Sequence, residues 1–169
     1  LKSTSDFEKE PSGLSFSAEN SFTNTSEIKA EVFYRTTGKD NLITRKSSLS
    51  PYINMPKGYG VEVEYSGPSD DFFQYGFEVD RRQGSRYSAA LGWQTSYQAK
   101  VSISPADTLS LSLFYKHGQE EDWLKWLQDN VLGTYEKKQR TTIAGFQWFK
   151  GNKHELRIKA QMVAFTARD

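Results

Sequence analysis

Hydrophobic and polar residues alternate along most of this chain, which is the pattern of β-strands with two unlike faces. In the clearest stretch, large apolar residues are separated by glycine and glutamate: Tyr59, Gly60, Val61, Glu62, Val63, Glu64 and Tyr65. The same period of two recurs in the stretches 14–19, 28–35, 59–65, 73–80, 86–104, 109–116, 136–149 and 153–165. The sequence therefore predicts about eight strands and an all-β fold.

Two of these stretches carry further information. In 86–104 one apolar phase runs from Tyr87 to Ile103 without a slip, whereas globular strands usually have about 5–6 residues and membrane-spanning strands about 9–11. The alternative, two strands with a break near Gln94–Tyr97, would need a turn without glycine or proline. In 136–149 the phase is unclear, because an apolar series ending in Phe146 and Trp148 competes with Ile143.

The connections between the predicted strands alternate between short and long. Short ones fall at 23–26, 67–70, 105–106 and 150–152, where Gly, Pro, Asn and Asp supply turn chemistry. Longer ones fall at 38–57 and 119–135, with a medium one near 81–85. An up-and-down antiparallel sheet with all its short turns at one end produces this order, and outer-membrane barrels have this arrangement.

Alternation alone does not decide which face lies inside. A soluble lipocalin-like barrel turns its apolar face inward and binds an apolar ligand there, whereas a membrane barrel turns that face to lipid. Long strands, a polar face of mixed charge, and aromatic residues at the ends of the apolar stripes favour the membrane barrel. These aromatic residues are Tyr59, Tyr65, Tyr87, Tyr115 and Trp148. The prediction is an antiparallel up-and-down transmembrane β-barrel of about eight strands in the bacterial outer membrane, with 1–169 as a single barrel domain or a segment of a larger barrel.

Composition narrows the function classes. The formal charge is +1, which excludes a strongly basic nucleic-acid arm, so no nucleic acid is expected as a partner. Aromatic residues make up 14% of the chain, which argues against disorder. The chain has no cysteine, so a disulfide scaffold and a thiolate metal site are excluded.

Charged residues on the polar phase are the candidates for a lumen site. As an ensemble they would set ion or solute selectivity in a pore, and the alternative is a ladder of cross-strand charge pairs. The candidates are Glu62, Glu64, Glu78, Lys100, Arg157 and Lys159. No convergent acid, base and nucleophile is visible, so neither catalysis nor a cofactor is expected. No metal site is expected from the two histidines, His117 and His154.

The segment Glu121–Gly133 interrupts the alternation. Trp123 and Trp126 share a helical face with two leucines, so a short helix is predicted inside an outside loop at 119–135. Its tryptophans could stack a saccharide or plug the lumen. The alternative is a helix that packs on the barrel rim or at the membrane interface.

The same segment carries a resemblance to a known family. The residues concerned are Leu42–Arg45, Asp122–Trp123, Trp126, Asp129–Asn130, Leu132–Gly133, Gln139, Trp148–Phe149 and His154–Lys159. Over roughly 40–165 the chain resembles a bacterial envelope family that joins an N-terminal domain like carbohydrate-binding family 9 to a C-terminal outer-membrane barrel. One departure is Lys46–Leu49, which reads KSSL where that family usually has Gly-Gly-Pro-Leu.

The resemblance implies a barrel of more than eight strands, more chain on both sides and a sugar-binding-like domain upstream. It implies no catalytic residues. The expected role is a channel, transporter or membrane anchor for saccharide-related solutes, and the expected partners are outer-membrane lipid and the strands or second chain that complete the barrel. A third class, a structural protein whose open sheet edges recruit another chain, also fits the pattern.

Overall fold

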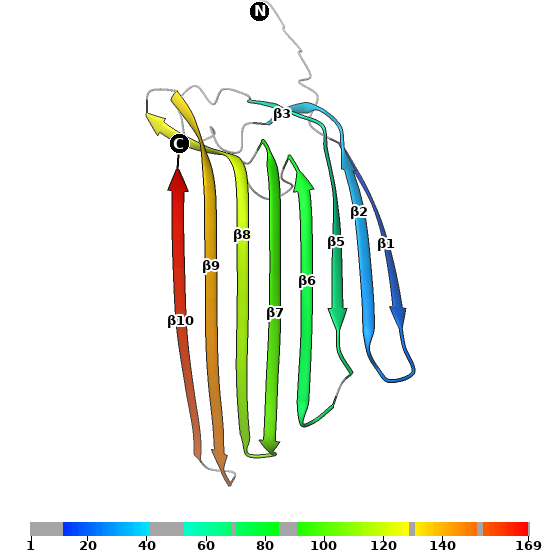
Figure 1. Ribbon diagram of the computed structural model, residues 1–169, viewed down its shortest axis with the longest axis vertical. Coiled ribbons are helices and arrows are strands. Elements are labelled where there is room, and N and C mark those ends of the chain that lie inside the picture. The colour runs from blue at the N-terminus through cyan, green and yellow to red at the C-terminus, as the bar shows by residue number, and fades with distance from the viewer. Residues whose placement is uncertain are drawn as a thin grey trace, which may run out of the picture.

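The computed structural model describes residues 12–40, 53–68, 70–84, 91–128, 131–151 and 154–168. In these ranges the chain forms one large antiparallel sheet and a two-stranded sheet beside it (Figure 1). The large sheet contains β1 (Gly13–Ser21), β2 (Glu27–Arg35), β5 (Gly58–Ser66), β6 (Phe73–Gln83), β7 (Trp93–Ala106), β8 (Leu109–Gln128), β9 (Val131–Lys150) and β10 (His154–Arg168). The small sheet pairs β3 (Gly38–Asp40) with β4 (Ile53–Met55), within the first long connection.

The large sheet is a simple meander. Its order is β1-β2-β5-β6-β7-β8-β9-β10, and every neighbouring pair is antiparallel. The predicted all-β, up-and-down antiparallel architecture of eight strands is therefore confirmed. The sheet is not closed into a barrel, because β1 and β10 lie at its two opposite edges (Figure 1).

The four connections predicted to be short, which join β1 to β2, β5 to β6, β7 to β8 and β9 to β10, lie together at one end of the sheet (Figure 1). Between β1 and β2, the Phe22 amide donates to the Ser26 carbonyl at 2.8 Å, and Thr25 adopts a φ of 65°. The Asn24 Oδ1 atom accepts hydrogen bonds from the Ser26 amide and hydroxyl, at 3.2 and 2.6 Å. The β7–β8 turn is at 107–108, two residues later than the sequence predicts.

No second layer of described residues covers the sheet. Among the described residues, the buried hydrophobic side chains are Met55 and Leu124, whereas Phe16 and Met162 are 67% and 65% exposed. A sheet of a globular domain buries its apolar face against another layer. The described residues leave the apolar face of this sheet without such a layer. No helix in the described part of the chain is long and apolar enough to cross a membrane.

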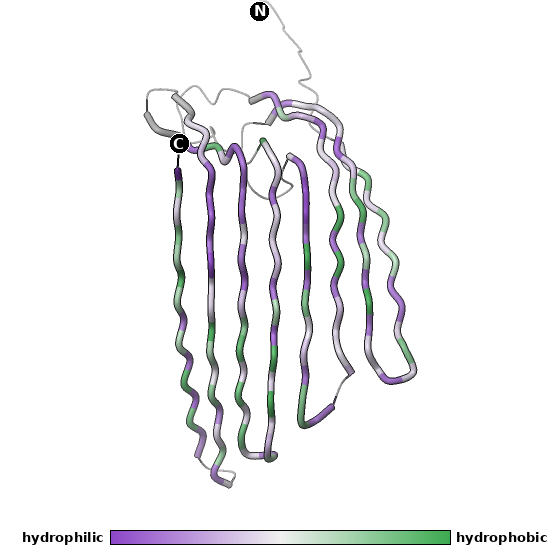
Figure 2. The backbone as a smooth tube through the Cα atoms, in the orientation of Figure 1, coloured by the Kyte–Doolittle hydropathy of each residue, from purple (hydrophilic) through white to green (hydrophobic). Residues whose placement is uncertain are grey.

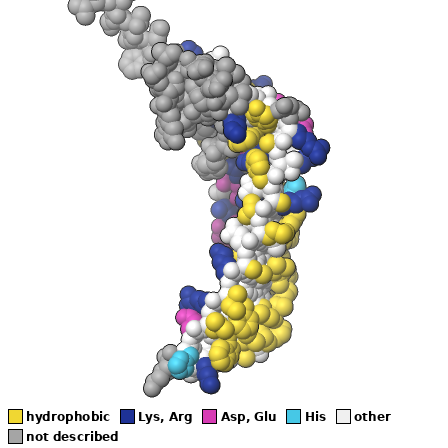
Figure 3. Space-filling model, turned by 90° about the vertical axis from the view of Figure 1, so that its left-hand side faces the viewer, with side chains coloured by type: hydrophobic (Ala, Val, Ile, Leu, Met, Phe, Trp, Pro, Cys, Tyr) yellow, Lys and Arg dark blue, Asp and Glu magenta, His cyan; other side chains and the backbone are white. Residues whose placement is uncertain are grey.

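The register gives the sheet an apolar face and a polar face, because directly paired residues point to the same side. One cross-strand row on the apolar face contains Phe73, Ile103, Leu111, Phe146 and Ile158. Viewed edge-on, hydrophobic side chains cover one side of the lower sheet, and charged side chains gather on the other side (Figure 3).

The register also resolves the unclear phase of the stretch 136–149. Phe146 and Trp148 pair with Leu111 and Leu109 and lie on the apolar face, whereas Ile143 pairs with Phe114 on the polar face. Cross-strand pairing decides this, and a single strand's sequence does not contain that information.

The long outside loop predicted at 119–135, and the short helix within it, are both wrong. Apart from residues 129–130, which lie outside the described residues, Glu121–Gly133 belongs to strands β8 and β9, which form a long hairpin. Trp123 pairs with Tyr135 and Leu124 with Thr134, with register shifts on either side of this part of the ladder. Continuing a ladder that is already formed satisfies the backbone groups that a new helix would leave unpaired at its ends.

The long strand predicted at 86–104 differs at its start. β7 begins at Trp93, and Leu91 and Gly92 form a bend. In this bend the Leu91 amide donates to the Asp122 carbonyl at 3.1 Å. Tyr87 lies outside the described residues.

The hairpin can be tested with a disulfide, because the chain has no other cysteine. Lys125 and Gly133 are directly paired, and paired residues have Cβ atoms about 4.5–5.5 Å apart. We expect the double variant Lys125→Cys, Gly133→Cys to form an intramolecular disulfide on mild oxidation, read by mobility on a non-reducing gel. In a helix the two positions would be about 12 Å apart along the axis.

Lys125→Cys with Glu136→Cys is the matched control, because this pair is three residues out of register and points to opposite faces. Equal crosslinking of both pairs, or crosslinking of neither, would contradict the hairpin.

Candidate functional site

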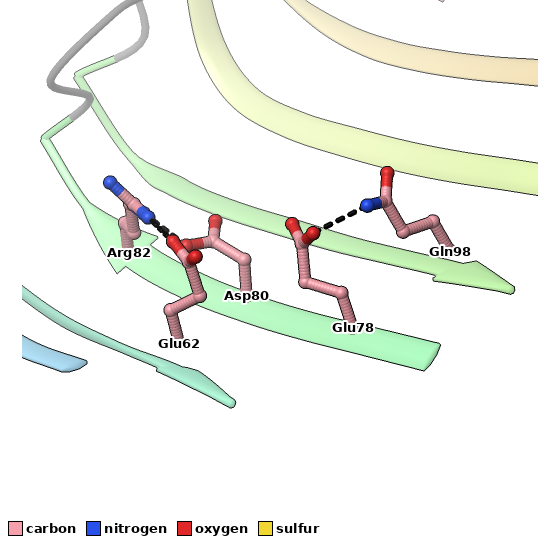
Figure 4. A network of polar contacts seen from close by, with 5 residues as sticks. All are labelled: Glu62, Glu78, Asp80, Arg82 and Gln98. Carbon is pink, nitrogen blue, oxygen red and sulfur yellow. Dashed lines mark hydrogen bonds and ion pairs between the residues drawn. The ribbon is translucent and has the colours of Figure 1, made fainter. Parts of the chain in front are cut away.

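The polar face of the central strands carries two neighbouring groups of hydrogen-bonded polar and charged side chains, here together called the Arg82 network. Its members are Glu62 on β5, Glu78, Asp80 and Arg82 on β6, and Gln98 on β7 (Figure 4). The period of two in β6 places its three members on one face. The register then sets Glu62 opposite Asp80 and Glu78 opposite Gln98.

Arg82 joins two strands through its guanidinium. The Nε atom donates to the Asp80 carboxylate, and the Nη2 atom donates to the Glu62 carboxylate. The side chains of Arg82 and Asp80 are 10% and 7% exposed, and that of Glu62 is 25% exposed. This two-carboxylate arrangement suits the fork of donors on an arginine, which a lysine does not provide. Beside it, Gln98 donates to the Glu78 carboxylate.

A glycine makes room for the arginine. Gly60 lies between Phe33 and Arg82 in one cross-strand row, and the Arg82 guanidinium carbon is 5.1 Å from the centre of the Phe33 ring. A Cβ atom at Gly60 would lie 2.5 Å from the Phe33 ring and 2.7 Å from the Arg81 carbonyl oxygen. The missing side chain therefore allows the ring and the guanidinium to meet across β5.

Further charged residues lie in the cross-strand row of Glu78. Glu64 pairs directly with Glu78 on one side and with Lys29 on the other, and Gln98 pairs with Lys116. A row of carboxylates is thus bordered by a lysine on each flank. This arrangement provides fixed charges and hydrogen-bonding groups on one wall, suited to attracting ions or polar solutes. It does not bring together a nucleophile with an acid and a base.

The structure brings together some of the predicted lumen residues and separates others. Glu62 and Glu78 belong to the Arg82 network, and Glu64 is their neighbour in the register. Lys100 lies toward the short turns, where its side chain crosses Gly76.

The other two predicted lumen residues lie on the edge strand β10. There Arg157 forms an ion pair with Glu155, and Lys159 pairs with Gly145 of β9. The six predicted residues therefore share a face but do not form one site.

A second group, here called the Trp123 cluster, lies on the long hairpin and β10. The Trp123 ring centre is 6.5 Å from that of Tyr135 and 6.1 Å from that of Phe165. The Lys137 ammonium lies 5.1 Å from the Trp123 ring centre and 2.8 Å from the Glu120 carboxylate. Lys137 thus occupies one face of the ring that a saccharide would stack on. The side chain of Trp126 lies outside the described residues.

Sequence reasoning missed Asp80, Arg82 and Gln98 as site residues. Asp80 and Arg82 have the same parity as Glu78 along β6, so the period of two was sufficient to place them on the polar face. Gln98 has no such signal of its own, because its role depends on pairing with Glu78.

Removing the central guanidinium should destabilise the sheet. We expect Arg82→Met to lower the free energy of unfolding by about 3 kcal/mol, because it leaves two partly or fully buried carboxylates without their partner. The measurement is the urea midpoint under conditions in which the parent chain folds.

Arg81→Met is the matched control for this measurement. Arg81 is the neighbouring residue on the opposite face, where its guanidinium carbon lies 4.7 Å from the Trp93 ring centre. That contact contributes about 1 kcal/mol or less. A larger loss from Arg81→Met than from Arg82→Met would contradict the importance of the network.

The chain was compared with protein-family models, with curated proteins and with solved structures. None of the three comparisons finds a match. The resemblance of residues 40–165 to a barrel-containing envelope family therefore stays a prediction, and the function is argued from the geometry of the sheet.

Proposed function

We propose that this chain forms all or part of a bacterial outer-membrane β-barrel that acts as a channel, transporter or membrane anchor. The observation that carries the proposal is the uncovered apolar face of the large sheet. Leu111, Leu113 and Ile158 are 43%, 52% and 55% exposed on it. An exposed apolar surface of this extent needs a nonaqueous cover, and lipid hydrocarbon provides one for strands of alternating polarity.

The opposite face supports the same proposal. A barrel whose apolar side contacts lipid has a polar interior, and the polar face here carries the Arg82 network, in which the Asp80 side chain is only 7% exposed. In the barrel this network would lie on the lumen wall and contribute to the selection of ions or solutes. The Trp123 cluster, near the end with the long connections, is the candidate contact for a saccharide-related solute (Figure 1).

The two edge strands define what a complete barrel requires. β1 and β10 pair with a neighbour on one side only among the described strands. Open edges are not tolerated in lipid, because their backbone groups would lack hydrogen-bond partners. Closure therefore joins these edges to each other, to further strands of the protein or to a second chain.

The proposal is tested by fractionation and gel mobility. We expect the chain in the outer-membrane fraction, with a mobility shift between unheated and boiled samples. Leu111→Arg should reduce the assembled fraction, because a cation at the middle of the bilayer costs about 2–4 kcal/mol. Glu64→Gln, on the polar face, is the control and should assemble like the parent.

The opposite result would reverse the assignment of the lipid-facing and interior faces. If Leu111→Arg assembled normally and Glu64→Gln did not, the apolar face would point inward. A chain that is soluble without detergent, shows no heat-dependent shift and binds an apolar probe would instead be a lipocalin-like barrel.

A further inference from the structure

The short turns of the large sheet descend in steps from β1–β2 to β9–β10 (Figure 1). The β1–β2 ladder ends at the pair Ser21 and Glu27, and the β9–β10 ladder ends at Lys150 and His154. Followed through the register, the cross-strand row of Glu27 reaches Gln161 in β10, which is seven residues beyond His154. Relative to the cross-strand rows, the turn end of the sheet therefore shifts by seven residues along the strands between β2 and β10, which are six strands apart in the sheet.

The apolar residues shift in the same direction. The cross-strand row of Val61 is apolar in the first three strands and changes to polar residues in β6, β7, β8, β9 and β10. Its members in strand order are Phe16, Val32, Val61, Arg81, Thr95, Gln119, Lys138 and Thr166. The row of Leu111, lower in the sheet, is apolar in β6 to β10. Figure 2 shows hydrophobic segments that lie higher in β2 and β5 than in β7 and β8.

Two features with independent causes thus shift in the same direction across the sheet. Turn positions depend on where the chain reverses, and the apolar residues depend on side-chain choice within the strands. A shift of about 1.2 residues per strand, with about 3.4 Å per residue and about 4.8 Å between strands, corresponds to an inclination of about 40°. Strands of membrane barrels are tilted by about 35–45°.

We propose that the surface in contact with lipid hydrocarbon is a band inclined by about 40° to the cross-strand rows. This inference rests on the proposed function and adds to it the depth at which each residue lies in the bilayer. The band follows the line of the short turns and includes Val61 on β5 and Leu111 on β8. Gln119, in the same row and on the same face as Val61, lies outside the band in water.

The inclined band also leaves the upper part of the long hairpin outside the membrane. On β8 the outward series Leu109, Leu111, Leu113 and Tyr115 is followed by His117 and Gln119. Their partners on β9 change in the same place, from Thr142 to Arg140 and Lys138. The part of the hairpin that carries the Trp123 cluster therefore extends beyond the bilayer, where a solute in water can reach it.

Single cysteines test this placement in a chain that has none of its own. Val61→Cys, Gln119→Cys and Leu111→Cys are each assembled in lipid vesicles, and assembly is checked by the heat-dependent gel shift. Each is then treated with a charged maleimide. We expect Gln119→Cys to label close to completion, and Val61→Cys and Leu111→Cys to stay near the level of the cysteine-free parent.

A second measurement does not depend on thiol reactivity. A small fluorophore attached to each cysteine before assembly should be quenched by lipids brominated in their acyl chains at Val61→Cys and Leu111→Cys. The same lipids should leave the fluorophore at Gln119→Cys close to its intensity in unbrominated vesicles.

The outcomes separate this inference from the proposed function. If Val61→Cys and Gln119→Cys behaved alike while Leu111→Cys stayed protected, the band would follow the rows and the inclination would be wrong, although the membrane face would stand. If all three labelled fully and none was quenched, the apolar face would not contact lipid, and the proposed function would fall with the inference.

Discussion

The rest of the structure depends on one feature: the large sheet has an apolar face that no other described part of the chain covers. The inner strands have their backbone groups paired on both sides, so the sheet satisfies its hydrogen bonds. Its hydrophobic side chains, in contrast, have no second layer to pack against. Under the proposed function, lipid supplies what a core supplies in a globular domain, and the two faces of the sheet then have different roles.

The role of the polar face follows from this difference between the two faces of the sheet. Arg82 and its partner Asp80 are among the least exposed charged groups of the described chain, on the face that the apolar side chains leave free. Their contacts connect β5 and β6 at side-chain level, in addition to the backbone ladder. Packing of the guanidinium on Phe33, across a glycine, adds a third strand. The same residues thus provide the charge of the polar face and side-chain contacts between neighbouring strands.

The sequence contains most of the information on strands and faces, because a period of two is visible in each strand separately. It contains less information wherever the outcome depends on a neighbour. Ile143 could not be placed before its pairing with Phe114 was known, and the tryptophans near 123 were misassigned because helical spacing competed with a ladder that only the partner strand reveals. Barrel closure has no local signal, because it depends on which edge β1 and β10 meet.

The common location of the short turns has a consequence for how such a sheet can change in size. Each pair of strands that shares a short turn is a hairpin that leaves and re-enters at the same end (Figure 1). Adding or deleting one whole hairpin keeps the direction of every other strand, the identity of both faces and the end on which the long connections lie. Duplication of a single hairpin is therefore a change in the width of the sheet that does not alter its sidedness, whereas loss of a single strand would invert all strands that follow it.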